Sequence, residues 1–446
     1  MNLTEKQIES LSVNPAAFKS GQKLSSASLW ETFGKTERAV WGKIKGSGKN
    51  PYLTQIDLED IAYKCSCPSR QFPCKHALAL LLLISKEGKS IKNNDTEPEW
   101  VKEWLEKRRK KSEPKEEIEL SEEETEKREQ QKEKRFEDRV KLVDSGVKEL
   151  EKWLHDIVKV GLLELPNKPP EDYKKLAARM VDAQCVGLAA WIRSLGNIDF
   201  SVPDVWQKES MHIIGKIHLL TQAWNNLTSF DNDMQMTVRN LIGWSQSSKD
   251  LMSDKDAKAI KDQWLILGEE TEDLEDLSVQ RFWLFGCHSG KAALILNFAT
   301  QYSSFENKLI PGTIIEAELA FFKGSHYQRA IVRFQKRILE KIEKYPEMPE
   351  TFEKFLEIHT TDLCLNPWLN NQAYLIKDVR ITKFNDNWYL SDNENKLILI
   401  LKNLNEDRMM KWLLFSGNEK ADAAFVLKGK NIMPLGLFIH NQYILL

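Results

Sequence analysis

The chain of 446 residues has no long hydrophobic run. Its longest apolar stretch, residues 77–84, falls far short of the roughly 18 residues that a membrane-spanning helix needs. The first 20 residues show no basic segment followed by an apolar one, which is the pattern of a secretory signal. We therefore expect no membrane segment, and a soluble protein of the cytoplasm.

The chain also has no large excess of charge of either sign. It holds 64 Lys and Arg against 66 Asp and Glu, a formal net charge of −2, so the whole protein is not a polycation. The first 95 residues differ, because they hold 14 basic against 9 acidic residues. This modest basic surplus is compatible with nucleic-acid binding and does not by itself indicate it.

No set of residues in the sequence assigns an acid, a base or a nucleophile. The segment 286–291 (Gly-Cys-His-Ser-Gly-Lys) invites two catalytic interpretations. Cys287 and His288 are adjacent, so on a strand they point to opposite faces and do not activate each other directly. The glycine spacing is one residue short of a P-loop, and Ala292 stands where Ser or Thr would hold Mg²⁺. We expect a hairpin turn here, no enzyme, and no identifiable small-molecule substrate.

The six cysteines fall into two groups. Three stand alone, and we expect buried free thiols there: Cys185, Cys287 and Cys364. The other three form a cluster with a histidine, as Cys65-Ser-Cys67, a gap of six residues, and Cys74-Lys-His76. Three sulfur ligands and one nitrogen ligand close a tetrahedral zinc site, whereas a catalytic zinc keeps one position open. The sequence therefore predicts one structural Zn²⁺, bound by Cys65, Cys67, Cys74 and His76.

The local pattern around the cluster supports this prediction. Residues 52–64 indicate extended chain, so Cys65 and Cys67 share one face and can reach one metal. Residues 77–84 favour helix, which places Cys74 near a helix N-terminus, where the dipole favours a thiolate. The alternatives are reduced cysteines without a metal, or a disulfide. Cys65 and Cys67 are too close to pair easily, and nothing indicates an oxidising compartment.

The pattern Cys-x-Cys, a short gap and Cys-x-His opening an apolar helix resembles the SWIM-type zinc finger over residues 56–83. The resemblance implies zinc ligation by the same four residues, and the family is generally credited with binding DNA or protein. The whole chain is similar in layout to long bacterial SWIM-type proteins, with the finger near the N-terminus and a long tail. Genes of those proteins often lie beside genes for AAA-type ATPases and von Willebrand A-type proteins, which points to partners of these kinds.

The chain divides by composition into four regions of an α+β multidomain protein. Residues 1–95 are the finger domain, a small β-sheet carrying the zinc knuckle. Residues 96–140 are rich in mixed charge and indicate a charged helical linker. Residues 141–275 indicate a helical domain, and residues 276–446 a β-rich, mostly antiparallel C-terminal domain.

Within these regions the periodicity predicts individual elements. Apolar residues at helical spacing predict helices near 141–162, 171–195, 204–227, 231–246 and 254–266. Alternation and turn signals predict strands at 281–285, 292–297, 313–322 and 327–334. A helix is expected near 349–359, followed by further strands, among them one at 412–416.

Two functions from different classes follow, and a third stays open. The first is nucleic-acid binding, to DNA or RNA, through phosphate contacts of the finger domain from Lys43, Lys45, Lys49, Lys64, Arg70 and Lys75. Trp41, Tyr52 or Phe72 would stack on bases. The second is a protein-interaction adaptor that uses the helical and β-rich regions. The third is an unrecognised catalytic fold in the C-terminal 300 residues.

Overall fold

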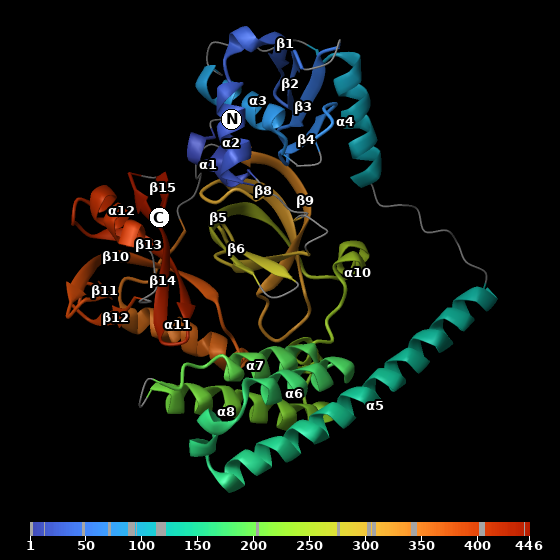
Figure 1. Cartoon of the computed structure of the whole chain (residues 1–446), viewed down its shortest axis with the longest axis vertical. Coiled ribbons are helices and arrows are strands. Elements are labelled where there is room, and N and C mark those ends of the chain that lie inside the picture. The colour runs from blue at the N-terminus through green and yellow to red at the C-terminus, as the bar shows by residue number, and fades with distance from the viewer. Residues whose placement is uncertain are drawn as a thin grey trace.

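The computed structural model is an α+β protein with a small β finger, a helical middle region and mostly antiparallel C-terminal sheets (Figure 1). This fold class was predicted from the sequence. The structure describes residues 3–12, 14–46, 50–69, 73–87, 94, 96–112, 122–201, 205–273, 277–300, 305, 309–339, 346–400, 406–440 and 442–446.

The finger is built on a four-stranded antiparallel sheet in the order β1 (Trp30–Lys35), β2 (Ala39–Ile44), β3 (Tyr52–Asp57) and β4 (Ala62–Cys65). It is preceded by α1 (Glu5–Ser10), α2 (Pro15–Lys23) and the 3₁₀ turn η1 (Ala27–Leu29). Helix α3 (Lys75–Glu87) buries residues 77–84 against Val40, Ile44 and Ile56 on one face of the sheet. The apolar run of the sequence is therefore the core of the finger.

Helix α4 (Glu99–Ser112) covers part of the other face of this sheet. Val101 and Leu105 pack there against Ala39 and Trp41. The Arg108 guanidinium lies 3.5 Å from the Asp57 carboxylate and 2.5 Å from that of Asp60. The helix whose sequence indicates a charged linker thus packs on the finger.

The helical region begins with α5 (Glu122–Val160), which is 39 residues long and runs across residue 140. It continues through η2 (Leu162–Asn167), α6 (Pro170–Asp182), α7 (Val186–Gly196), α8 (Val205–Asn225), η3 (Leu227–Ser229), α9 (Asn232–Ile242) and α10 (Ser248–Ser253). From Val143 onward α5 contributes buried residues to a shared core with α6 to α9. The first four predicted helices are confirmed, with 171–195 divided into α6 and α7.

A closed five-stranded barrel follows, formed by β5 (Ala259–Asp273), β6 (Ser278–Gly286), β7 (Ala292–Ala299), β8 (Ile314–Phe321) and β9 (Arg329–Leu339). The order around the barrel is β5-β6-β7-β9-β8; β7 and β9 pair in parallel, and the other pairs are antiparallel. This order is that of the five-stranded Greek-key barrel known as the OB-fold.

The predicted helix over 254–266 is wrong, because this segment leads into strand β5. Trp264 and Ile266 point into the barrel, while Leu265 and Leu267 pack outward against the C-terminal sheet. A strand buried on both faces has a continuous apolar run, which periodicity alone does not separate from a helix.

The C-terminal module is a six-stranded antiparallel sheet in the order β12-β11-β10-β13-β14-β15. Its elements are α11 (Phe352–Leu365), β10 (Gln372–Phe384), β11 (Asn387–Ser391), β12 (Leu397–Leu399), α12 (Glu406–Ser416), β13 (Ala421–Lys428), β14 (Asn431–Ile439) and β15 (Gln442–Leu445). Residues 412–416 belong to helix α12, so the strand expected there is wrong. Met409 and Trp412, three positions apart, are the buried face of that helix.

The barrel lies at the centre and contacts the other three parts (Figure 1). The finger rests on it through Ile310, which joins the finger core, and through a 2.7 Å hydrogen bond from the Gln335 side chain to the Glu59 carbonyl. The C-terminal sheet covers the outer face of β5 to β7, where the Trp283 indole donates to the Asn371 carbonyl at 2.8 Å. Within the described residues, no helix is long and apolar enough to cross a membrane.

Candidate metal centre

Two adjoining segments of the finger bring the cysteine and histidine side chains together. Cys65 is the last residue of β4, and Cys67 follows two residues later. Cys74 directly precedes α3, with its carbonyl accepting from the Leu78 N–H at 3.1 Å, and His76 is the second residue of that helix. One ligand atom from each residue lies within 4.8 Å of the others. The four form a candidate site for a single zinc ion.

The dimensions of the cluster suit zinc. The Cys65 Sγ lies 3.8 Å from the His76 Nδ1. Two ligands on one tetrahedral zinc, with bonds of about 2.3 Å to sulfur and 2.0 Å to nitrogen, lie roughly 3.6 Å apart. Cys74 and His76 are buried, and Cys65 and Cys67 are half-buried. Zinc binding by this cluster is therefore supported by geometry as well as by the residue types.

Electrostatics prepares one of the thiols for metal binding. Hydrogen bonding to the Cys65 thiol lowers the pKa of Cys74 to about 4, despite burial, and the Ala77 backbone N–H in the first turn of α3 acts in the same direction. The same Cys65–Cys74 bond, together with burial, raises the pKa of Cys65. Thr54, whose Oγ1 lies 3.1 Å from the Cys65 Sγ, is a neighbour that the motif alone did not reveal.

The basic residues predicted to contact phosphate fall into three groups. Lys43 and Lys64 lie on the same face of the sheet, because Lys43 pairs with Leu53, Gln55 pairs with Lys64, and alternate residues share a face. That face is opposite to α3. Lys45 is exposed just beyond β2, and Lys75 is exposed at the start of α3, between two zinc ligands. Lys49 and Arg70 lie outside the described residues.

The aromatic residues proposed to stack on bases are less available. Trp41 is only 5% exposed beneath α4, so the prediction that it stacks on a base is wrong. The Tyr52 ring lies against the His76 ring, with centroids 5.1 Å apart, and so supports the metal centre. Phe72 lies outside the described residues.

The segment 286–291 forms the predicted hairpin turn between β6 and β7. Cys287 is buried, whereas the His288 ring is half-exposed and bonds to Asp262. The two side chains therefore do not act on each other. Cys185 is buried as expected, but Cys364 is exposed, and the expectation of a buried thiol there is wrong.

Two domain families match parts of the chain. The SWIM zinc finger matches residues 52–85, which contain all four candidate ligands. The SWIM-associated four-helix bundle domain matches residues 138–242, from near the middle of α5 to the end of α9. No curated protein and no solved structure matches the chain.

Proposed function

Because the chain is a SWIM-type zinc finger protein, we propose that it binds nucleic acid through the sheet of its finger and is not an enzyme. The observation that carries the proposal is the shared face of Lys43 and Lys64, opposite to the helix that completes the zinc site. Ammonium groups on one face of a small rigid sheet can follow a phosphate backbone, whichever bases it carries.

Two acidic residues of the same domain are already paired with arginines. Asp57 and Asp60, at the β3–β4 turn, are held by Arg108 of α4, and Arg38 lies 3.7 Å from Asp57. These basic and acidic groups neutralise one another. Lys43, Lys45 and Lys64 form no ion pair among the described residues, so their charge remains for an external anion.

The test is fluorescence anisotropy of the zinc-loaded full chain with labelled single- and double-stranded DNA and RNA, titrated with salt. We expect affinity to fall steeply with salt, with each lysine–phosphate contact contributing about 0.7–0.9 to the slope of log affinity against log salt. The double variant Lys43→Glu/Lys64→Glu should lose at least about tenfold in affinity. Lys208→Glu, an exposed charge reversal on α8, is the matched control. Salt-independent binding, or equal loss in the control, would contradict the proposal.

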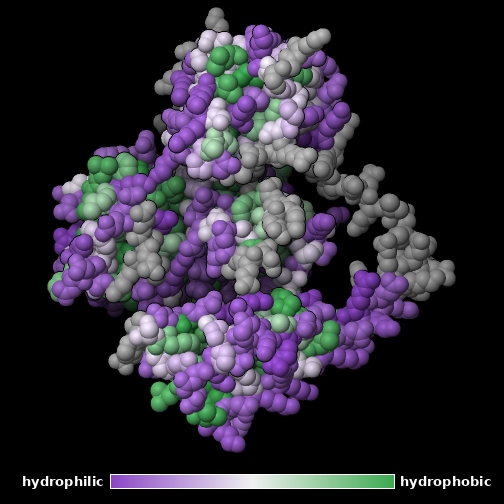
Figure 2. Space-filling view, viewed as in Figure 1, coloured by the Kyte–Doolittle hydropathy of each residue, from purple (hydrophilic) through white to green (hydrophobic). Residues whose placement is uncertain are grey.

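A second candidate function is a protein adaptor, and exposed apolar surface favours it. Val158, Val160 and Leu163, around the end of α5, are 73%, 68% and 75% exposed. Figure 2 shows hydrophobic surface at this lower end of the helical region. Met410 and Leu414 form a second exposed pair, one turn apart on α12. Patches of this kind mark protein contacts when they are contiguous. AAA-type ATPases and von Willebrand A-type proteins are the partner classes to test.

The adaptor is tested by capture of such a partner with the full chain and with the variant Val158→Ser/Leu163→Ser. Retention by the full chain and loss in the variant would support it, and undiminished retention would contradict the assigned surface. We further propose a cytoplasmic location, because the site requires three reduced thiols.

A further inference from the structure

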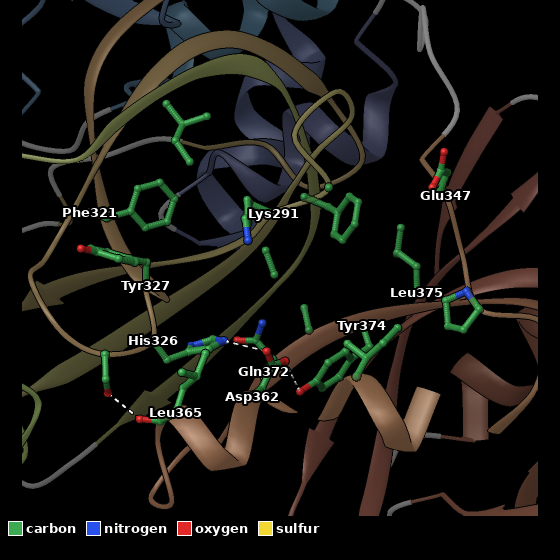
Figure 3. Close-up of a pocket in the computed structure, with 18 of the residues that line it drawn as sticks. Lys291, Phe321, His326, Tyr327, Glu347, Asp362, Leu365, Gln372, Tyr374 and Leu375 are labelled. Atoms are coloured by element: carbon green, nitrogen blue, oxygen red, sulfur yellow. Dashed lines mark hydrogen bonds and ion pairs between the residues drawn. The ribbon is translucent and has the colours of Figure 1, made fainter. Parts of the chain in front are cut away.

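A cavity of about 480 Å³ lies between the barrel and the C-terminal module, far in sequence from the zinc site. Its walls come from the hairpin after β6, the β8–β9 connection, α11 and the start of β10 (Figure 3). The volume is within the range of about 300–1,000 Å³ typical of small-molecule sites. We call it the interdomain cavity.

The interdomain cavity lies beside the face of the barrel that the C-terminal module covers. Here the outer face of β6 and β7, with Trp283 and Leu294, is packed against Ala373 and Leu375 of the C-terminal sheet. The β8–β9 connection instead contacts α9 and α11 through Ser325 and His326, and Ser325, His326 and Tyr327 from it line the cavity.

Two nearly buried side chains that line the interdomain cavity each have a polar atom without a hydrogen-bond partner among the described residues. Gln372 is 6% exposed, and among the described residues no group donates to its Oε1. The His326 side chain is 10% exposed, and its Nδ1 likewise has no partner in the described part of the chain. Buried polar atoms are nearly always hydrogen-bonded in folded proteins, so two such atoms at one cavity indicate a missing donor.

A chain of polar contacts orients the His326 ring. The Asp362 carboxylate lies 3.2 Å from the His326 Nε2 and accepts from the Tyr374 hydroxyl at 3.0 Å. The Tyr374 oxygen in turn lies 2.8 Å from the His359 Nδ1. With a proton on the Nε2 that faces Asp362, Nδ1 is the nitrogen left to accept. Figure 3 shows His326, Asp362, Gln372 and Tyr374 together on one wall.

Cationic and aromatic groups complete the interdomain cavity. Lys258 and Lys291 line it and, among the described residues, form no ion pair. The Lys258 ammonium lies 3.9 Å from the centre of the Tyr327 ring. Figure 3 shows Lys291 between Tyr327 and Glu347, with the Glu347 carboxylate on the side away from Tyr327. Phe285 and Phe321 add aromatic surface.

We propose that the interdomain cavity binds a nucleotide, whose base donates to Gln372 and His326 while its phosphate pairs with Lys258 and Lys291. A ligand with this chemistry needs adjacent N–H donors, a planar ring and an anionic group, and a nucleotide with an amino-bearing base has all three. Inorganic phosphate would leave both acceptors without donors. The nucleotide is either free or the end of a single strand, since both present the same groups.

Isothermal titration calorimetry of the full zinc-loaded chain tests the site with AMP, GMP, CMP, UMP and inorganic phosphate. We expect dissociation constants below about 1 mM for the better amino-bearing nucleotides, which corresponds to weak but specific binding. UMP has a single ring N–H between two carbonyls, so it should bind at least about fivefold more weakly, and phosphate at least about tenfold more weakly. Equal affinity for phosphate and nucleotides, or no binding at millimolar concentration, overturns the proposal.

Two variants separate the chemistry of the interdomain cavity from the fold. Gln372→Met removes the unpartnered oxygen at similar volume, so thermal stability should hold while nucleotide affinity falls at least about tenfold. Lys291→Glu reverses an exposed charge and should have a similar effect through the phosphate. Lys208→Glu on α8 is the control and should bind as the parent chain does. An equal loss in this control, or unchanged binding in both cavity variants, overturns the assignment.

The proposal is independent of the finger, and the same experiment shows this. The finger variant Lys43→Glu/Lys64→Glu should keep full nucleotide affinity in the interdomain cavity. A loss of nucleotide affinity in this variant would overturn the assignment of the binding site to the cavity. A 5′-phosphorylated single-stranded oligonucleotide, added to the finger variant, distinguishes the two sources. Competition with AMP identifies the strand end as the ligand, and no competition identifies the free nucleotide.

Discussion

Cys65 and Cys74 face each other in the metal centre, and one hydrogen bond moves their pKa values in opposite directions. A zinc ion takes both thiols as thiolates, so metal binding replaces that shared proton. Cys74 makes this replacement easier, because the bond to Cys65 and, to a smaller extent, the Ala77 N–H in the first turn of α3 already favour its thiolate. The position of Cys74 at the start of a helix thus adds to what the motif supplies.

We expect Cys74→Ser to lower the zinc content from about one ion per chain to well below one. A three-ligand remnant loses binding free energy that is also folding free energy, part of the roughly 10–16 kcal/mol that structural zinc contributes in finger peptides. The measurement is metal analysis together with thermal unfolding. Cys364→Ser, which changes an exposed thiol outside the cluster, should leave both unchanged. Full zinc occupancy in Cys74→Ser would contradict the ligand assignment.

Glu269 is a second residue with an unusual environment. It lies on β5 opposite Phe282, and burial raises its pKa to about 7. The unfolded chain loses this proton near pH 4.5, whereas the folded chain keeps it until about pH 7. The carboxyl group therefore lowers stability progressively as pH rises through this window, and the full loss is present above it.

We expect Glu269→Gln to be roughly 1–3 kcal/mol more stable than the parent chain at pH 8, and close to it at pH 4.5. The lower part of this range allows for solvent that still reaches the side chain. Chemical denaturation at the two pH values measures the difference. Glu419→Gln, an exposed glutamate, is the control and should show no pH-dependent gain. A constant difference at both pH values would contradict the raised pKa.

At the scale of elements, one buried carboxylate binds the turn of the β6–β7 hairpin through several hydrogen bonds. The buried Asp262 accepts from the backbone N–H of His288 at 3.1 Å and of Ser289 at 2.8 Å, and its Oδ1 lies 2.9 Å from the His288 ring. Gly286 makes the approach feasible, because a Cβ there would lie 2.5 Å from the Asp262 Oδ2. Although burial opposes ionisation, these hydrogen bonds hold the pKa of Asp262 below its usual value.

We expect Asp262→Asn to destabilise the protein by about 2–4 kcal/mol at pH 7, since an amide cannot accept all of these bonds. The stabilisation by Asp262 is fully present above the usual aspartate pKa of about 3.9, and is lost as pH falls through its lower folded pKa. The difference in unfolding free energy between variant and parent should therefore become smaller below pH 4. Urea unfolding at several pH values measures it, with the exposed Asp182→Asn as control. A gap that stays constant down to pH 2 would contradict the mechanism.

The sequence predicts best those elements whose residue pattern depends on a single local constraint, such as one metal ion or one buried face. The zinc ligands and the α3 run are local, so spacing alone reveals them, and the long helices show their period because one face is buried. Strand β5 was mistaken for a helix because both of its faces are buried. Part of α12 was mistaken for a strand because its short apolar run 412–415 also suits a strand. The sequence does not predict the interdomain cavity, because its lining residues come together only in the folded chain: Lys258, Lys291, His326 and Gln372.

At the scale of the whole molecule, the helical region and the C-terminal module share a tryptophan. Trp368, just after α11, is buried in the core of the helical bundle, and its indole donates to the Lys216 carbonyl at 3.1 Å. A second contact joins the bundle to the barrel, where the Thr237 and Ser325 hydroxyls lie 2.9 Å apart. The bundle is therefore fixed to both neighbouring modules.

We expect Trp368→Ala to lower the free energy that holds the bundle against the C-terminal module by about 3–5 kcal/mol, as for other buried aromatic residues. The bundle should then separate more readily from the rest, which limited proteolysis and small-angle scattering would detect as faster cleavage and a larger radius. Phe384→Ala, which changes a 60% exposed aromatic residue of the same module, is the control. Unchanged dimensions and cleavage rate in Trp368→Ala would show that Trp368 does not fix the bundle.

The finger rests on a part of the chain that is made much later. Glu59 and Gln335, which join them, are 276 positions apart. Ribosomes add about 5–20 residues per second, so the finger emerges roughly 14–55 s before the strand that supports it. During that interval the nascent finger lacks the contact with the barrel, and zinc is the main ligand that can stabilise it. We expect zinc supply during translation, more than zinc added afterwards, to set the yield of folded protein.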